Sequence, residues 1–306
     1  KHNQAIFYNE ELIAFFSLSD VETIDFELFY KINLNEEPII IKNTWDIFSN
    51  NGIALQRDYE KITEGRKSLP IPDSVNVVNP EQIFIEEGAI LNFVTINASK
   101  GPVYIGKNSE IMEGSIIRGP LALCEGAVLK LGTKIYGPTT VGPYSKVGGE
   151  VNNSVISGYS NKGHDGFLGN SVIGEWCNLG ADTNTSNLKN NYAEVRLWDY
   201  ESGRFASTGL QFCGLMMGDH SKCAINTMFN TGTVVGVCAN IFGSGFPRNF
   251  IPSFSWGGSQ GFTTYLTSKA FEVAKIVMSR RNVEFTEQDE YILTTIFNQT
   301  EDFRKS

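Results

Sequence analysis

The chain has 306 residues, of which 41% are hydrophobic and 30 are glycine, and it carries a net charge of −9. It contains no run of the roughly 18 consecutive apolar residues that a membrane helix needs, and its basic residues are scattered rather than gathered in a stripe. We therefore expect neither membrane insertion nor nucleic-acid binding. The five cysteines include no Cys-x-x-Cys pair, which predicts small buried thiols in a reducing cytoplasm.

Residues 1–65 show mixed α/β patterning. The run Pro38 to Ile41 is strand-like, and the stretch from Trp45 to Ile62 is helix-like. This region is too short for a complete catalytic domain. Residues 66–80 hold three of the ten prolines and are interpreted as a linker.

From Ile105 onwards, an aliphatic residue recurs every six positions. The members of this series are Ile105, Ile111, Ile117, Leu123, Leu129, Ile135, Val141 and Val147. The series breaks after Val147, resumes at Phe167, Ile173 and Leu179, and returns at Met217, Cys223, Phe229, Val235 and Ile241. A period of six fits neither a helix nor a lone sheet. It predicts a mainly β protein whose residues 81–258 form a left-handed parallel β-helix of hexapeptide repeats, rather than a β-sandwich with accidental spacing.

The pattern becomes helical beyond Gly261, and residues 259–306 are predicted to form a C-terminal helical arm. One apolar face contains Tyr265, Leu266, Ala270, Phe271, Ala274 and Met278. A second helix is expected to begin at Thr286, because Asp289 three residues later resembles a capping box. Such helices can close the end of a solenoid or cover a ligand.

Chemistry is expected where the repeat fails, in the interruptions at 153–165 and 184–214. The second contains a predicted hairpin, from Val195 to Trp198 and back through Phe205. His164 lies in the first. A free imidazole titrates near pH 6.5, so His164 can serve as a general base; the alternative is a turn histidine. Of the other histidines, His2 lies in the N-terminal segment and His220 is expected to face solvent.

Other polar residues in these regions have two interpretations each. Asn178, Asn184 and Asn187 can bind sugar hydroxyls or fill left-handed turn positions. Four basic residues can either contact a phosphate or be solvated surface charges: Lys162, Lys189, Arg118 and Lys134. Trp256 and Arg248 can serve the adenine and a phosphate of a cofactor, or they can simply pack.

Two motifs, Gly163 to Gly169 (GHDGFLG) and Asn178 to Asn187 (NLGADTNTSN), carry a resemblance. They are similar to the acetyltransferase half of the bifunctional N-acetylglucosamine-1-phosphate uridyltransferase/glucosamine-1-phosphate acetyltransferase family. The chain more closely resembles the Bacteroidetes alternative form of that family, a sugar nucleotidyltransferase with a hexapeptide-repeat acyltransferase region. Stretches that carry this second likeness include 45–48, 110–115, 171–180 and 226–232.

The resemblance implies an acetyl-CoA-dependent N-acetyltransferase acting on an amino-sugar phosphate such as glucosamine-1-phosphate. It implies that His164 is the base and that Asn178 and Asn187 contact the acceptor or the histidine. It further implies a cytoplasmic homotrimer with active sites between neighbouring prisms, acetyl-CoA as co-substrate and no metal in the β-helix.

The chain also departs from that family. Phe167 stands where the family has a sugar-contacting tyrosine, and Asn152 stands where it has an acceptor-binding lysine. Arg118 is our first choice for the phosphate-site arginine. The glycine-rich loop of a nucleotidyltransferase is missing between Lys1 and Arg66, so residues 1–65 are interpreted as the C-terminal remnant of such a domain, with any nucleotidyl site upstream.

Two alternatives to acyl transfer remain open at this point. The first is a non-catalytic scaffold that binds a sugar phosphate or sugar nucleotide, and the second is a nucleotidyltransferase whose catalytic half precedes this chain. A zinc-dependent carbonic anhydrase of the same fold is set aside, because it requires three histidine ligands from adjacent coils.

Overall fold

The computed structural model of the chain describes residues 3–18 and 25–305. Its contacts divide the chain into two compact units, 1–42 and 43–306. In the first unit, β1 (Gln4–Tyr8) pairs antiparallel with β2 (Glu11–Phe16) and parallel with β3 (Tyr30–Asn33), which follows the 3-10 helix Phe26–Leu28. The predicted strand at Pro38 to Ile41 is wrong: these residues have no regular secondary structure. Proline has no N–H to donate to a strand ladder.

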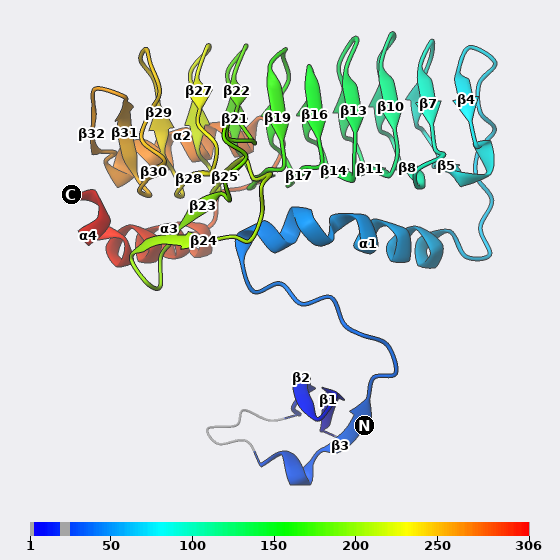
Figure 1. The fold of residues 1–306 in the computed structure, drawn as a ribbon, viewed down its shortest axis with the longest axis horizontal. Coiled ribbons are helices and arrows are strands. Elements are labelled where there is room, and N and C mark those ends of the chain that lie inside the picture. The colour runs from blue at the N-terminus through cyan, green and yellow to red at the C-terminus, as the bar shows by residue number, and fades with distance from the viewer. Residues whose placement is uncertain (1–2, 19–24, 306) are drawn as a thin grey trace. The chain divides into compact units, whose positions relative to one another are not determined.

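The second unit is a parallel β-helix with three faces, and each short strand pairs with the strand one coil further on (Figure 1). Face 1 contains β4 (Asn76–Val78), β7 (Thr95–Asn97), β10 (Ile116–Arg118), β13 (Lys134–Tyr136), β16 (Glu150–Asn152) and β19 (Phe167–Gly169), and it continues through β22 (Asn184–Thr185) and β27 (Met228–Phe229).

Face 2 contains β5 (Ile83–Ile85), β8 (Val103–Ile105), β11 (Leu121–Leu123), β14 (Thr139–Val141), β17 (Val155–Ile156), β20 (Val172–Ile173), β25 (Leu215–Met217), β28 (Thr233–Val235) and β30 (Phe250–Ile251). Face 3 contains β6 (Ile90–Leu91), β9 (Glu110–Ile111), β12 (Val128–Leu129), β15 (Lys146–Val147), β18 (Asn161–Lys162), β21 (Asn178–Leu179), β26 (Lys222–Cys223), β29 (Asn240–Ile241) and β31 (Ser255–Gly258), with β32 (Gly261–Thr264) added antiparallel. The predicted hexapeptide β-helix is confirmed.

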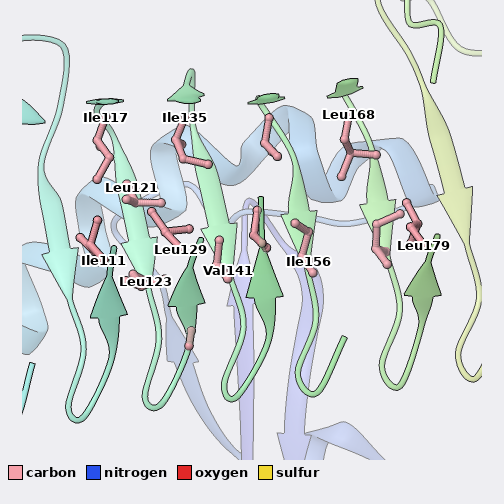
Figure 2. Close-up of a cluster of buried hydrophobic side chains, with 14 of the residues drawn as sticks. Ile111, Ile117, Leu121, Leu123, Leu129, Ile135, Val141, Ile156, Leu168 and Leu179 are labelled. Atoms are coloured by element: carbon pink, nitrogen blue, oxygen red, sulfur yellow. The ribbon is translucent and has the colours of Figure 1, made fainter. Parts of the chain in front are cut away.

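The interior of the prism is a stack of aliphatic side chains that project inward from the strands (Figure 2). The series from Ile105 to Val147 is buried throughout, as expected from the period of six. The predicted break in the period after Val147 is confirmed, because the next inward residues, Val151 and Ile156, follow at shorter intervals. The stack itself continues across the break and reaches Lys162. Leu168 rather than Phe167 then occupies the interior.

A long helix, α1 (Thr44–Thr63), lies along face 2 and contacts β14, β17 and β20 (Figure 1). It begins with a capping box formed by Asn43 and Asp46. The buried amide of Asn51 donates to the Pro138 carbonyl at 3.1 Å and accepts from the Thr140 hydroxyl at 2.9 Å. The predicted helix at 45–62 is therefore confirmed, and it belongs to the second unit together with the β-helix.

The segments at the C-terminal end largely follow the predicted order. The helices there are α2 (Thr267–Ser279), α3 (Glu287–Gln299) and α4 (Glu301–Arg304), and the capping box of Thr286 and Asp289 is present. The predicted hairpin is confirmed as β23 (Arg196–Asp199) and β24 (Arg204–Ser207). None of the helices in the described ranges combines the length and apolar character needed to cross a bilayer.

A column of stacked rings follows the corner between faces 2 and 3. Its members are Tyr144, Tyr159, Trp176 and His220, with successive centroids 5.2, 4.2 and 6.2 Å apart. All four have positive φ angles of 57–59°. The prediction that His220 faces solvent is wrong, because its Nδ1 is buried without a partner among the described residues. Burial lowers the pKa of His220 to about 4.

The predicted burial of the cysteines also holds. Four of the five thiols are buried and Cys124 is half-buried. Burial raises the pKa of Cys177, Cys213 and Cys238 to about 12. These thiols are therefore protonated at neutral pH and behave as small apolar groups.

Candidate active site

His164 lies at the corner between β18 on face 3 and β19 on face 1, and its side chain is exposed. The corner is closely packed on the next coil. Gly166 has a φ of 117°, and a Cβ at this position would lie 2.2 Å from the Thr183 carbonyl oxygen, so glycine is required. The corner thus presents an imidazole to solvent from a backbone that is held in place.

Lys162 fixes this corner from inside the prism. Its ammonium donates to the carbonyl oxygens of Gly148 and His164, both at 2.9 Å, and the residue is 3% exposed. Burial lowers the pKa of Lys162 to about 8, while the charges of Asp165 and Asp182 act in the opposite direction. This placement contradicts both predictions for Lys162, a phosphate contact and a solvated surface charge, because the ammonium points into the core. Its position six residues before Leu168 was a signal for burial.

Asn184 fixes the same corner from the next coil. Its side-chain oxygen accepts a hydrogen bond from the Phe167 N–H at 2.9 Å. Its amide nitrogen donates to the backbone and side chain of Asp182 at 3.1 and 3.2 Å. The structure thus gives Asn184 a positioning role beneath the loop that carries His164.

Phe167 and Asn187 meet above Gly169 on the outer side of β19. A Cβ on Gly169 would lie 2.5 Å from the Phe167 ring and 2.7 Å from the Asn187 amide nitrogen. That nitrogen donates to the side-chain oxygen of Asn170 at 2.8 Å. Gly169 and Asn170 were not predicted from the sequence. The signal was their spacing, because Asn170 and Asn187 lie 17 residues apart, the separation of hydrogen-bonded neighbours in adjacent coils elsewhere in the solenoid.

Asn152 and Arg118 lie on the same face. Asn152 pairs in register with Tyr136 on one side and Gly169 on the other, and its amide donates to the Tyr136 carbonyl at 3.1 Å. Arg118 is exposed at the end of β10, two strands from Asn152, which corresponds to roughly 10 Å. Face 1 therefore gathers an aromatic ring, two amides and, further along, a guanidinium.

Asn178 is an exposed residue of β21 on face 3, where it pairs with Asn161 of the preceding coil. It therefore lies on a different face from Asn152 and Phe167. Since faces 3 and 1 meet at the His164 corner, the predicted residues lie on both sides of the imidazole.

The two residues predicted to bind a cofactor line different cavities. Trp256 packs edge-on against Phe242 at 4.5 Å and borders a cavity of about 430 Å³ beside α2. Arg248 lies over the Phe262 ring at 5.4 Å and borders a second cavity, which also contains Lys189.

The fold and the site together define a hexapeptide-repeat β-helix protein with an exposed histidine on a fixed corner. The profile of the family described as "Sugar nucleotidyl transferase" matches residues 1–67. A Sulfurisphaera tokodaii protein named bifunctional sugar-1-phosphate nucleotidylyltransferase/acetyltransferase is 32% identical over 224 residues, which make up 63% of this chain and 55% of that protein.

Two further similarities were found. The Methanocaldococcus jannaschii bifunctional protein GlmU is 33% identical over 192 residues, covering 63% of this chain and 40% of that protein. Among solved structures, the polySia-specific acetyltransferase NeuO aligns with 67% of this chain and 100% of its own, at 13% identity and a TM-score of 0.36. The chain spans 55% and 40% of the lengths of the two bifunctional relatives.

Proposed function

We propose that this chain is an acetyl-CoA-dependent N-acetyltransferase that acts on an amino-sugar phosphate, such as glucosamine-1-phosphate, in a sugar-nucleotide pathway. The observation that carries the proposal is the exposed imidazole of His164, on a corner held by Lys162 from within and by Asn184 from the next coil. The name of the Sulfurisphaera tokodaii relative, which includes both activities, supports it.

In this mechanism the acceptor amine attacks the thioester carbonyl carbon while His164 takes the amine proton. An N–C bond forms, and backbone N–H groups beside the acceptor stabilise the oxyanion. The C–S bond then breaks, and the CoA thiolate recovers the proton from the imidazolium. No covalent enzyme intermediate is needed.

The acceptor is expected to bind over face 1. Phe167 presents an apolar ring at the position where the family that the chain resembles has the hydroxyl of a tyrosine. Asn152 presents a neutral amide where that family has the ammonium of a lysine. Arg118 supplies the phosphate contact in this proposal, and Asn178 approaches from face 3. Because this site is open at the surface, we also propose that it is completed by neighbouring prisms in a cytoplasmic homotrimer.

The test is a release assay for the CoA thiol with acetyl-CoA and a panel of amino-sugar phosphates. His164→Ala is expected to lower turnover by roughly 10²- to 10⁴-fold, the usual contribution of a general base. His220→Phe is the matched control, since this second histidine of the solenoid is half-buried in the ring column, and it is expected to retain activity. Light scattering checks that both variants keep the oligomeric state of the parent. Unchanged transfer by His164→Ala would refute the assignment.

The match over residues 1–67 supports a second proposal, that this segment is the end of a nucleotidyltransferase-like domain. Because residues 1–66 contain no glycine-rich phosphate-binding loop, the chain itself is expected to transfer no nucleotidyl group. Pyrophosphate release from UTP and a sugar 1-phosphate would contradict this.

A further inference from the structure

A second cavity, which His164 does not line, is bordered by residues of the hairpin β23–β24, of β30 and of α4. Its volume is about 650 Å³, within the range of roughly 300 to 1,000 Å³ that is usual for small-molecule sites. The site proposed above does not use it. Its walls come from separate segments of the chain, because the hairpin folds back over the end of the solenoid.

The charged residues that line this cavity are all basic. They are Lys189, Arg196 and Arg248. Among the described residues that form its walls, none is Asp or Glu, although the whole chain has 34 acidic residues and 25 basic ones. A local excess of cations in an acidic protein attracts anions.

Backbone carbonyls hold two of these cations in place. Lys189 donates to the Glu194 carbonyl at 2.7 Å, and Arg196 donates to the Phe205 carbonyl. Carbonyl acceptors orient the side chains without cancelling their charge. The Glu194 carboxylate, which does not line the cavity, accepts from the Ser207 hydroxyl and the Gly209 N–H. These bonds, and then the charges of Lys189 and Arg196, lower the pKa of Glu194, so this carboxylate offsets part of the charge of the two cations.

Four of the remaining lining residues are aromatic, and the other two are Thr231 and Asn249. Trp198 stacks on Phe250 with centroids 4.1 Å apart, and the rings of Phe205 and Phe303 meet it edge-on at 5.4 and 6.1 Å. The indole N–H of Trp198 is buried and has no acceptor among the described residues. Rings of this kind bind the flat face of a base, and the cations beside them bind phosphate oxygens.

We propose that this cavity is a binding site for a nucleoside phosphate. Arg196, Arg248 and Lys189 bind the phosphate oxygens, and the base packs against the aromatic wall. The inference goes beyond acetyl transfer, because it requires no turnover. Two sources share this chemistry, the nucleotide portion of CoA and the nucleoside diphosphate of a sugar nucleotide.

The experiment is calorimetric titration of the chain with four probes: adenosine 3′,5′-bisphosphate, UDP, inorganic phosphate and adenosine. We expect at least one nucleotide to bind, and its affinity to fall as ionic strength rises. Tighter binding of the adenosine bisphosphate identifies CoA as the source, and tighter binding of UDP identifies a sugar nucleotide.

Three variants locate the binding. Arg196→Gln and Arg248→Gln are each expected to weaken nucleotide binding by about 10-fold or more, the usual loss for a charged hydrogen bond. Arg204→Gln on the same hairpin is the matched control, since Arg204 does not line the cavity, and it is expected to bind normally. Melting temperatures check that all three variants fold.

Three results would overturn the inference. They are no nucleotide binding at millimolar concentration, binding that is indifferent to Arg196→Gln and Arg248→Gln, and phosphate binding as tight as that of the nucleotides. Because the titration measures binding alone, an inactive His164 would leave its outcome unaffected.

Discussion

Replacing Lys162 with methionine tests the interior of the candidate active site. Methionine has a similar length and no charge, so it can fill the same inward position. The substitution removes two hydrogen bonds of 2.9 Å, to the carbonyls of Gly148 and His164. It also removes a charge whose burial lowers the pKa of Lys162 from 10.5 to about 8. The loss of the hydrogen bonds is expected to lower the free energy of unfolding, and the removal of the buried charge is expected to raise it.

The pH dependence separates the two effects. Because the pKa of Lys162 is lower in the folded protein than in the unfolded chain, the unfolded chain binds more protons between about pH 8 and 10.5. At pH 7 the buried charge costs the folded state about 3 kcal/mol relative to a neutral amine. That cost diminishes as the pH rises, and the wild type is expected to gain about 1.4 kcal/mol over Lys162→Met between pH 7 and pH 9.

The assay is urea unfolding of both proteins at pH 7 and pH 9, with the difference between them taken at each pH. This difference cancels every other titrating group that the two proteins share. An equal difference at the two pH values would refute the burial of a charged Lys162. In the acetyl-transfer assay, Lys162→Met is expected to lower turnover, because the His164 carbonyl loses its partner.

Three further outcomes follow from single contacts. Gly169→Ala is expected to raise the KM for the acceptor in the thiol-release assay, since its Cβ would displace Phe167; an unchanged KM would exclude a role for that ring. Asn51→Ala is expected to lower the free energy of unfolding by about 1 to 3 kcal/mol, because the Pro138 carbonyl loses its buried donor, whereas exposed Gln56→Ala should change it little. The pKa of His220 in the folded protein, about 4, lies below its ordinary value of 6.5, so the unfolded chain binds more protons between these values and stability is lost as the pH falls through them. His220→Phe is expected to remove about 2 kcal/mol of the stability loss between pH 7 and pH 5. Urea unfolding at the two pH values measures this difference.

The period of six was sufficient to predict the β-helix, because a repeated inward position reflects the same burial in every coil. The period of six did not predict the inward residues correctly where the corners differ in length. Corner length varies by one or two residues without disturbing the stack, so a strict period missed Val151 and Ile156 and placed Phe167 inside. Lys162 was misjudged because a charge suggests solvent, whereas its neighbours in the stack supply carbonyl acceptors that only the folded corner brings together.

The sequence predicted which residues lie around His164 better than it predicted what each of them contacts. The corner was predicted from the interruption of the repeat and from its histidine, while the hydrogen bond between Asn184 and the Phe167 N–H depends on stacking across coils. The cavity beside the hairpin could not be predicted, because Arg196 and Arg248 are 52 residues apart in the sequence. Such a separation has no signature in local pattern.

The hairpin between faces 1 and 2 also affects how the solenoid assembles. Elsewhere, neighbouring strands are joined through about one coil, as in the bond between Cys177 and Ser160, which spans 17 residues; across the hairpin, Leu215 reaches Ser171 over 44 residues. Closing the longer loop costs roughly 0.8 kcal/mol more chain entropy. When the β-helix forms coil by coil, the largest entropic cost therefore falls at the hairpin. The coils before it form through local contacts, whereas the coils after it must pair with residues that are more distant in the sequence.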